Sequence, residues 1–355
     1  MIFFDVEQPY YLPQYFPVCQ LLLARGMACT FVFYRSNCDA NVIQGTLPKG
    51  VKTEWVAESE KATQLYLSTK PQWLVLGTGF KNVDKIKQAG ISTAVIYHGA
   101  GVKTSGYSEL LNQVDVRFVE GSHHFEALSN LHPKGNFCLT GFSKLDPLIN
   151  QKLSLPSLEQ MGLDESKKTL LYAPTFYPSS IEMMAHDLPH DLADYNLIIK
   201  LHHFSYHKKK YQKQLVLAQS WAEAENVFLV SADENSILPY LGLADLLISE
   251  ASSTLFEFAA LNKPVVWCDF LKLRWTYRGI FSYRFKRRMD QRILPYRDIA
   301  AHAEKYTDLK RVIDEQIGQP DQFSEKRLEY SERLLGPLDG KASERIVDYL
   351  LNHLQ

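Results

Sequence analysis

The sequence predicts an α/β protein made of two facing doubly wound domains with a cleft between them. Short apolar runs alternate with helical patterns along the chain, which is typical of mostly parallel sheets covered on both faces. The alternation stops at residues 144–168, a stretch with prolines, serines and charges, and then restarts. The length of 355 residues also exceeds the roughly 250–300 at which a single core stops growing. We therefore expect domains at 1–150 and 151–336, and a helix within 337–355 that packs toward the N-terminal domain.

The expected strands are short and rich in apolar, β-branched or aromatic residues. In the first half they lie at 2–4, 29–34, 73–76, 93–97, 116–119 and 137–140, with helices at about 12–25 and 82–88. In the second half they lie at 169–172, 197–201, 227–230, 246–249 and 264–268, with helices at about 208–225 and 253–261. Ligands of open α/β sheets bind outside the carboxyl ends of the strands, so the loops that follow these strands are the candidate sites.

Composition excludes several classes of protein. The formal net charge is −1, which does not favour nucleic acid as a partner. The five cysteines lie far apart and form no C-x-x-C pair, a pattern that fits a reducing compartment rather than a disulfide framework. The N-terminal residues lack the features of a signal peptide, and no window approaches the roughly 18–20 uncharged apolar residues that span a bilayer. We expect a cytoplasmic protein.

Two glycine-rich segments do not fit phosphate-binding motifs of known spacing. Residues 99–104 contain Gly-Val-Lys-Thr, but a P-loop needs four residues between its first glycine and the Gly-Lys pair. Neither this segment nor residues 77–82 has the third glycine of a dinucleotide fingerprint.

His98 directly follows an expected strand and is followed by Gly99. The unperturbed pKa of an imidazole lies near neutral pH, so this group is suited to accept the proton of an attacking hydroxyl, while the glycine allows a substrate to approach closely. A histidine that only bonds a loop carbonyl explains the position about equally well.

Lys200, His202 and His203 end another expected strand in the second half. Strand alternation places Lys200 and His202 on one side, where an ammonium group and an imidazole can both donate to phosphate oxygens. We expect a phosphate site here rather than zinc, because no third ligand lies at a usual spacing. We predict no metal and no other cofactor. The alternative is a solvated loop.

The segment from Glu250 to Thr254 has an acid and three hydroxyls, and it opens a helix. Ser252 or Ser253 is a natural N-cap, and the N–H groups at the helix start form an anion site. Glu250 is suited to bond a ribose or a polar head group. Thr175 adds a hydroxyl at the end of a neighbouring expected strand. Plain helix capping accounts for one serine but not for all three hydroxyls and the acid.

Residues 272–292 hold eight basic side chains and five aromatic ones against a single acid, Asp290. Such a stretch suits a membrane surface or an anionic acceptor. A solvated loop with some buried aromatics is the alternative.

Together these segments resemble the CDP-glycerol glycerophosphotransferase family, which includes teichoic acid primases and polymerases and has the GT-B fold. The similar segments are Tyr97-His98-Gly99 with Lys103, Gly141 to Asp146, Tyr172 to Phe176, Lys200-Leu-His202, Ala244 to Ser253, Arg278 to Phe281, and Asp339 to Ser343. The chain departs from the family where Glu250-Ala251 replaces Asp-Tyr, where His203 replaces proline, and where the stretch after Phe281 is basic.

The resemblance implies a transferase that moves a glycerol-phosphate or related polyol-phosphate group from a CDP-alcohol to an acceptor hydroxyl and releases CMP. It implies that Ser252, Ser253, Lys200 and His202 hold the donor diphosphate, and that His98 is the base, without a metal. It also implies a lipid-linked or polymeric acceptor at the inner face of the cytoplasmic membrane. The alternatives are a glycosyltransferase that uses a CMP-, UDP- or GDP-sugar, a sugar-nucleotide epimerase of the same shape, and a non-enzymatic binding module.

Overall fold

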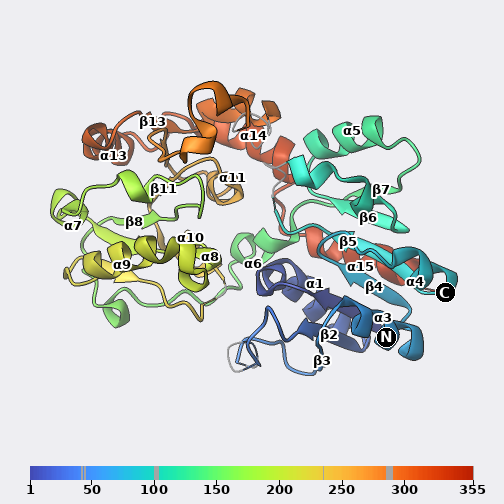
Figure 1. Ribbon diagram of the computed structural model, residues 1–355. Coiled ribbons are helices and arrows are strands. Elements are labelled where there is room, and N and C mark those ends of the chain that lie inside the picture. Colours follow the sequence, from blue (N-terminus) through green and yellow to red (C-terminus); the bar gives the residue numbers. More distant parts are fainter. Residues whose placement is uncertain (41–42, 44, 100–103, 235, 285–290, 355) are drawn as a thin grey trace. The chain divides into compact units, whose positions relative to one another are not determined.

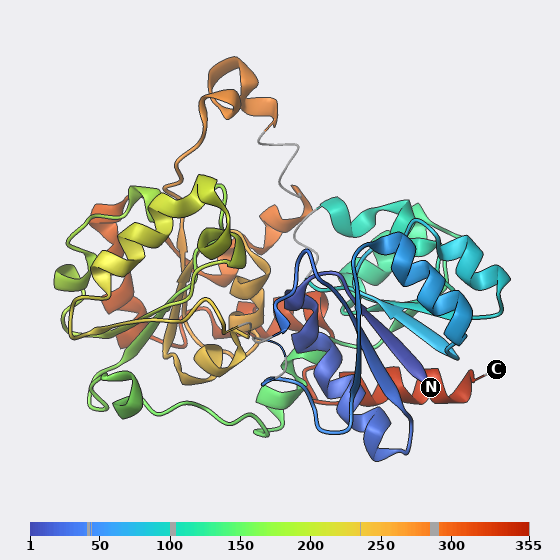
Figure 2. The same cartoon turned by 60° about the horizontal axis from the view of Figure 1, so that its bottom comes forward.

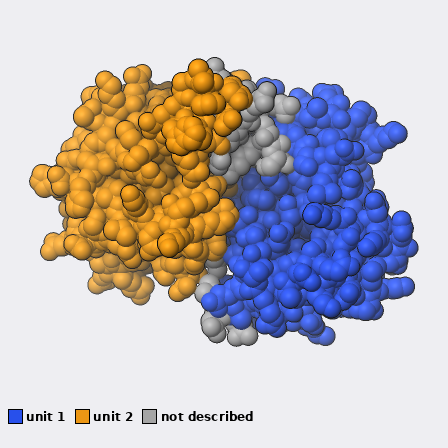
Figure 3. All heavy atoms as spheres, viewed as in Figure 1, with its two compact units in different colours: residues 1–152, 332–355 blue, residues 153–331 orange. Residues whose placement is uncertain are grey.

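The computed structural model describes residues 1–355 except 41–42, 44, 100–103, 235, 285–290 and 355. The chain forms two compact units (Figure 3). Unit 1 comprises Met1–Lys152 and Glu332–Gln355, and unit 2 comprises Leu153–Ser331. Each unit has its own parallel sheet, as the alternation of strand and helix patterns predicts.

Unit 1 contains a seven-stranded sheet in the order β3-β2-β1-β4-β5-β6-β7 (Figure 1). The strands are β1 (Ile2–Val6), β2 (Cys29–Tyr34), β3 (Lys52–Val56), β4 (Trp73–Leu76), β5 (Ser92–Ile96), β6 (Val116–Val119) and β7 (Phe137–Leu139). The helices are α1 (Leu12–Ala24), α3 (Ser59–Thr69), α4 (Val83–Gln88), α5 (Ser122–Leu131), α6 (Asp146–Ile149) and α15 (Ala342–Asn352).

Helices cover both faces of this sheet (Figure 2), because alternate strand residues enter different cores. Phe4 packs with residues of α1 and α15, whereas its neighbour Phe3 packs with residues of α3 and α4. The C-terminal helix α15 is therefore part of unit 1. Its Leu350 carbonyl accepts a hydrogen bond from the Trp73 indole at 3.0 Å.

Unit 2 contains a six-stranded sheet in the order β10-β9-β8-β11-β12-β13. The strands are β8 (Thr169–Tyr172), β9 (Asn196–Ile199), β10 (Val227–Leu229), β11 (Leu246–Ser249), β12 (Val265–Cys268) and β13 (Ala301–Ala303). The helices are α7 (Leu188–Asp191), α8 (His203–His207), α9 (Gln212–Trp221), α10 (Leu238–Leu243), α11 (Ser253–Ala259), α13 (Leu309–Gly318) and α14 (Ser324–Leu335), the last of which continues into unit 1 from Glu332.

Two strands and one helix differ from the expectation. We predicted neither β3, where Lys52 and Glu54 weaken the apolar pattern, nor β13, which has only three residues. The helix expected at 208–225 is shorter than predicted. Lys208 is extended, a 3₁₀ turn occupies Lys209–Tyr211, and α9 spans only Gln212–Trp221.

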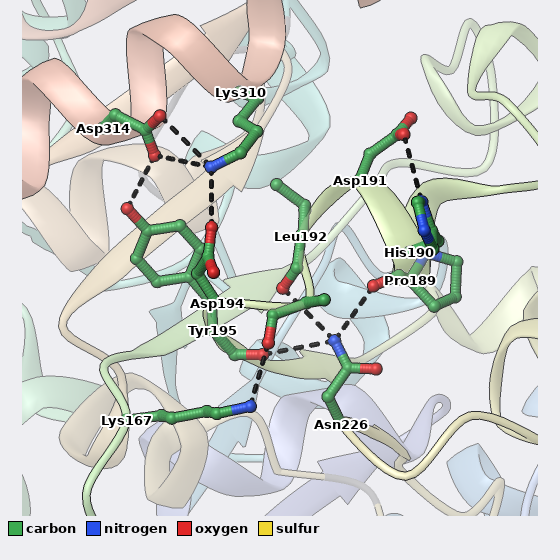
Figure 4. Close-up of polar contacts among 11 residues, drawn as sticks. Lys167, Pro189, His190, Asp191, Leu192, Asp194, Tyr195, Asn226, Lys310 and Asp314 are labelled. Atoms are coloured by element: carbon green, nitrogen blue, oxygen red, sulfur yellow. Dashed lines mark hydrogen bonds and ion pairs between the residues drawn. The ribbon is translucent and has the colours of Figure 1, made fainter.

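Polar contacts hold the amino ends of the unit 2 strands together (Figure 4). The Asn226 amide, just before β10, donates to the carbonyls of Pro189, Leu192 and Tyr195 at 3.1–3.2 Å. Lys310 of α13 pairs with Asp194 and Asp314. These contacts lie at the end of the sheet opposite the candidate ligand loops, so we interpret them as structural.

Within the part of the chain that the structure describes, no helix is long and apolar enough to cross a membrane.

Candidate functional site

The strand order of both sheets indicates where a ligand binds. In each sheet the first three strands of the unit follow one another in one direction, and the later strands are added on the other side of the first strand. The winding direction therefore reverses between β1 and β4 in unit 1 and between β8 and β11 in unit 2. Open α/β sheets bind ligands at such a reversal, outside the carboxyl ends of the strands. The predicted donor-site residues lie in the loops that follow β8, β9 and β11, or in the first turns of α8 and α11, at or beside the unit 2 reversal.

Glu250 links the two loops at this reversal. It follows β11, and its Oε1 accepts hydrogen bonds from the backbone N–H groups of Thr175 at 3.0 Å and Ser180 at 3.1 Å. Its Oε2 accepts from the Ser180 hydroxyl at 3.0 Å. The loop after β8 is thus folded around this carboxyl group.

Burial sets the electrostatics of Glu250. The side chain is 1% exposed, and burial raises its pKa from 4.5 to about 7 despite the hydrogen bonds from Ser179, Ser180 and Thr175. We expected Glu250 to contact a ribose or head group directly. In the structure both carboxyl oxygens accept hydrogen bonds from the protein, and the ligand contact stays a prediction.

Thr175 is also used internally. Its hydroxyl donates to the Pro178 carbonyl at 2.6 Å and lies 3.4 Å from Glu250. The hydrogen bonds of Thr175 and Glu250 therefore hold the loop after β8 in its conformation.

Ser252, Ser253 and Thr254 are half-buried and lie at the start of α11. Ser252 occupies the N-cap position, as predicted, but its side chain makes no capping hydrogen bond. Its hydroxyl pairs instead with the Ser249 hydroxyl at 3.2 Å, and Ser249 donates to the Ala173 carbonyl at 2.7 Å. The backbone N–H groups of the first helical turn are therefore not capped by Ser252, which suits an anion site.

Lys200 follows β9, on the other side of β8 from Glu250. Its ammonium group donates to the Glu234 carbonyl at 2.6 Å and lies 5.4 Å from the Tyr206 ring centre. Burial lowers its pKa to about 8, so the group remains mostly charged at neutral pH.

The hydrogen bonds of His202 define its tautomer. Its Nδ1 accepts from the Phe204 N–H at 3.1 Å and thereby caps α8. In the neutral ring the proton is consequently on Nε2, which makes that atom a donor. His203 contacts His207, with ring centres 4.3 Å apart, and burial lowers its pKa to about 4, so it is neutral at pH 7.

The sheet order β9-β8-β11 brings these loops together. Neighbouring strands lie about 4.8 Å apart, so the ends of β9 and β11 are separated by about 10 Å. Lys200, His202 and the start of α11 thus lie within reach of one ligand.

In unit 1, His98 lies in the loop that follows β5, beside the reversal between β1 and β4. Its Nδ1 lies 2.9 Å from the Gly77 carbonyl. A carbonyl only accepts, so Nδ1 carries the proton and the neutral ring has its lone pair on Nε2. This tautomer can act as a base. Gly99 follows in the same loop, and Lys103 lies outside the described residues.

Sequence reasoning missed the two tyrosines that flank His98. Tyr10 and Tyr11 lie on the turn between β1 and α1, with ring centres 5.1 and 4.8 Å from the imidazole. The sequence offers no periodic or spacing signal for this contact, because β1 and β5 are separated by about ninety residues.

The basic-aromatic stretch is described from 272 to 284, and residues 285–290 lie outside the described part. Arg278 is exposed, and Trp275 and Ile280 are 74% and 85% exposed. Three of its described basic groups have partners. Lys272 pairs with Glu182, Arg274 lies over the Tyr177 ring, and Arg284 lies over the Phe281 ring.

Among the described residues, no three His, Cys, Asp or Glu side chains are grouped in a way that could hold a metal ion.

Curated proteins of teichoic acid synthesis are similar to part of this chain. The teichoic acid ribitol-phosphate primase of Bacillus spizizenii is 28% identical over 194 residues, which cover 53% of this chain and 45% of the primase. The teichoic acid poly(glycerol phosphate) polymerase of the same organism is 24% identical over 221 residues, covering 52% and 54%. The chain spans about half the length of the curated relatives it matches.

Solved structures share the fold. The wall teichoic acid polymerase TagF matches with a TM-score of 0.69 at 16% identity, covering all of this chain and 88% of that one. The UDP-GlcNAc 2-epimerase of Neisseria meningitidis matches with a TM-score of 0.62 at 14% identity, covering 99% and 100%. These likenesses identify a two-domain α/β fold of the GT-B type, as predicted.

The model of one protein family matches residues 101–352, well over half of the chain and all of unit 2. The chain belongs to the CDP-glycerol:poly(glycerophosphate) glycerophosphotransferase family.

Proposed function

We propose that this chain transfers a glycerol-phosphate or related polyol-phosphate group from a CDP-alcohol to an acceptor hydroxyl, with release of CMP, in the synthesis of a cell-surface polymer. The main support is that residues suited to a diphosphate lie at the strand-order reversal of unit 2, within the segment that matches the family. The named relatives act in glycerol-phosphate or ribitol-phosphate polymer synthesis, and a TagF variant was soaked with CDPG.

In this proposal the donor diphosphate binds to unit 2. The hydroxyls of Ser252 and Ser253 and the N–H groups of the first α11 turn take the phosphate oxygens. Lys200 supplies positive charge, and His202 supplies the Nε2–H donor that its tautomer provides. Thr254 and His203 lie in the first turns of α11 and α8, beside these groups. Glu250 and Thr175 have a positioning role, because they hold the loop after β8 in place.

The transfer step follows from these roles. The acceptor oxygen attacks the phosphorus that carries the glycerol, a new P–O bond forms, and the P–O bond to CMP breaks. His98 takes the acceptor proton on Nε2, and CMP leaves with the electron pair of the broken bond. Positioning and charge stabilisation supply most of the rate enhancement in phosphoryl transfer of this kind.

The direct test is a panel of donors incubated with the purified full chain. We expect CDP-glycerol or CDP-ribitol to raise the melting temperature, since a ligand of the native state stabilises it by mass action. Lys200→Ala should weaken this effect, whereas Lys209→Ala, which removes an exposed lysine of the following turn, should not. Phosphorus NMR should show CMP when an acceptor is present.

Two other outcomes would redirect the assignment. Stabilisation by a CMP-, UDP- or GDP-sugar, with nucleotide release, would indicate a glycosyltransferase. Conversion of a UDP-sugar without any acceptor would indicate an epimerase, whose fold the chain shares.

We further propose that the acceptor is lipid-linked or polymeric and that the exposed part of 272–292 contacts an anionic membrane surface. Arg278 and the exposed Trp275 and Ile280 support this proposal, since cations and amphipathic aromatics are favoured at such interfaces. Co-sedimentation with phosphatidylglycerol vesicles tests it, and equal binding to phosphatidylcholine vesicles would contradict the role of charge.

A further inference from the structure

Aromatic rings surround His98 on several sides. The imidazole stacks on Tyr11 with ring centres 4.8 Å apart and an interplanar angle of 30°. Tyr10 lies at 5.1 Å and Tyr97 at 4.6 Å. Tyr11 itself is 3% exposed, so the surface on which the imidazole rests is fixed by the core of unit 1.

Gly77 contacts both members of this stacked pair. Its carbonyl lies 2.9 Å from His98 Nδ1, which sets the tautomer. A β-carbon at this position would lie 2.5 Å from Tyr11 Cδ2 and 2.8 Å from the Tyr15 hydroxyl. Any side chain at residue 77 would therefore displace the Tyr11 ring from beneath the imidazole.

Neither Tyr10 nor Tyr11 is suited to be the base. Burial raises the pKa of Tyr10 to about 12 and that of Tyr11 still further. Both hydroxyls therefore keep their protons at any pH at which the enzyme would work. Their rings contribute shape, which leaves the imidazole as the proton acceptor of the proposed function.

We propose that Tyr11 and Gly77 are positioning residues that act through His98. Gly77 fixes which nitrogen carries the proton, and the Tyr11 ring fixes the plane of the imidazole, so that the Nε2 lone pair has one direction. The inference rests on the proposed function, in which His98 accepts the proton of the acceptor hydroxyl. Misplacing a reacting group by about 1 Å can cost about 100-fold in rate.

The test is a double-mutant cycle on the full chain, with turnover of CDP-glycerol as the readout. Tyr11→Leu should lower kcat by about 10–100-fold with little change in the KM for the donor. Tyr11→Phe keeps the ring and should stay within about 3-fold of wild type. In a His98→Ala background, Tyr11→Leu should cost less than about 3-fold more, because residues that act through one group are not additive. Equal losses in both backgrounds would overturn the proposal.

A second readout does not depend on activity. Nitrogen-15 NMR of the histidine side chains should show His98 protonated on Nδ1 in the wild type and in Tyr11→Phe at a pH where the ring is neutral. Tyr11→Leu should shift the ring resonances, since a stacked aromatic neighbour is lost. Gly77→Ala should resemble Tyr11→Leu if it folds.

These measurements distinguish the positioning role of Tyr11 from the role of His98 as the base. Wild-type turnover by Tyr11→Leu, together with an inactive His98→Ala variant, would overturn the positioning proposal and leave the base assignment intact. An Nε2–H tautomer in the wild type would contradict both, because Nε2 would then have no lone pair to accept a proton. Full activity of His98→Ala would overturn the base assignment and with it the claim that Tyr11 acts through His98.

Discussion

Glu250 offers a quantitative test of how the candidate donor site is held together. Glu250→Ala removes the acceptor of two backbone N–H groups, those of Thr175 and Ser180, and of the Ser180 hydroxyl. A buried polar group left without a partner costs about 1–3 kcal/mol. Ser180 is fully buried and Thr175 only half-buried, so we expect the substitution to destabilise unit 2 by about 2–4 kcal/mol.

The pH dependence of this loss has a definite sign. The folded state raises the pKa of Glu250 from 4.5 to about 7, so it binds this proton more tightly than the unfolded chain. The stability that the group contributes is present in full below about pH 4.5 and is lost as the pH rises through 7. The change amounts to at most about 3 kcal/mol. The gap between wild type and Glu250→Ala should therefore be largest at and below about pH 4.5 and should shrink toward pH 8.

Glu250→Gln is the matched control. It keeps one oxygen for the two backbone N–H groups and has no titration, so we expect a loss of about 1 kcal/mol and a gap to Glu250→Ala that is constant with pH. Hydrogen exchange of peptides over 173–181 measures the effect locally, which avoids treating two units as one transition. A loss under about 1 kcal/mol at pH 5, or a gap that widens toward pH 8, would refute this reasoning.

Three further predictions concern individual side chains. His98→Ala should lower turnover by about 10²–10⁴-fold with donor affinity nearly unchanged, and full activity of this variant would exclude His98 as the base. The control is His190→Ala, which removes a side chain that is 92% exposed and should leave turnover and donor affinity unchanged. The pKa of Lys200 is lowered to about 8, so donor affinity in the wild type should weaken as the pH rises from 7 to 9.5. Lys200→Arg stays charged and should keep its affinity over this range, and the same pH dependence in both proteins would contradict a contact between the ammonium group and the donor. Replacing Trp275 and Ile280 by serine should reduce binding to phosphatidylglycerol vesicles, whereas Val216→Ser, at a 56% exposed site on α9, should not. Unchanged co-sedimentation of the Trp275 and Ile280 double variant would contradict the membrane contact.

The sequence alone predicted much of the fold because buried parallel strands have a simple signature. Most strands of both sheets are short continuous apolar runs, which the pattern detects directly. The pattern fails for β3, whose burial alternates between exposed and half-buried positions, and for β13, which is too short. It also places the start of α9 too early, because lysine is a good helix former and no local rule predicts the extended conformation of Lys208.

The candidate site was predictable in its location and less so in its contacts. The position of Lys200, His202 and Ser252 after strands follows from the alternation of elements. The internal use of Glu250 does not, because its partners Thr175 and Ser180 are 70–75 residues away and the bonds depend on β8 and β11 being neighbours. The same holds for Tyr11 and His98, which meet only because β1 and β4 pair and Gly77 leaves room for the ring.

A binding titration with CDP-glycerol tests the central claim most directly, namely that the loops after β9 and β11 hold an activated diphosphate. Isothermal titration of the wild type should give saturable binding, and a Lys200→Ala, Ser252→Ala double variant that still folds should lose at least about tenfold in affinity, equivalent to about 1.4 kcal/mol. Wild-type affinity in that variant, or a preference for UDP-sugars over every CDP-alcohol tested, would contradict the account.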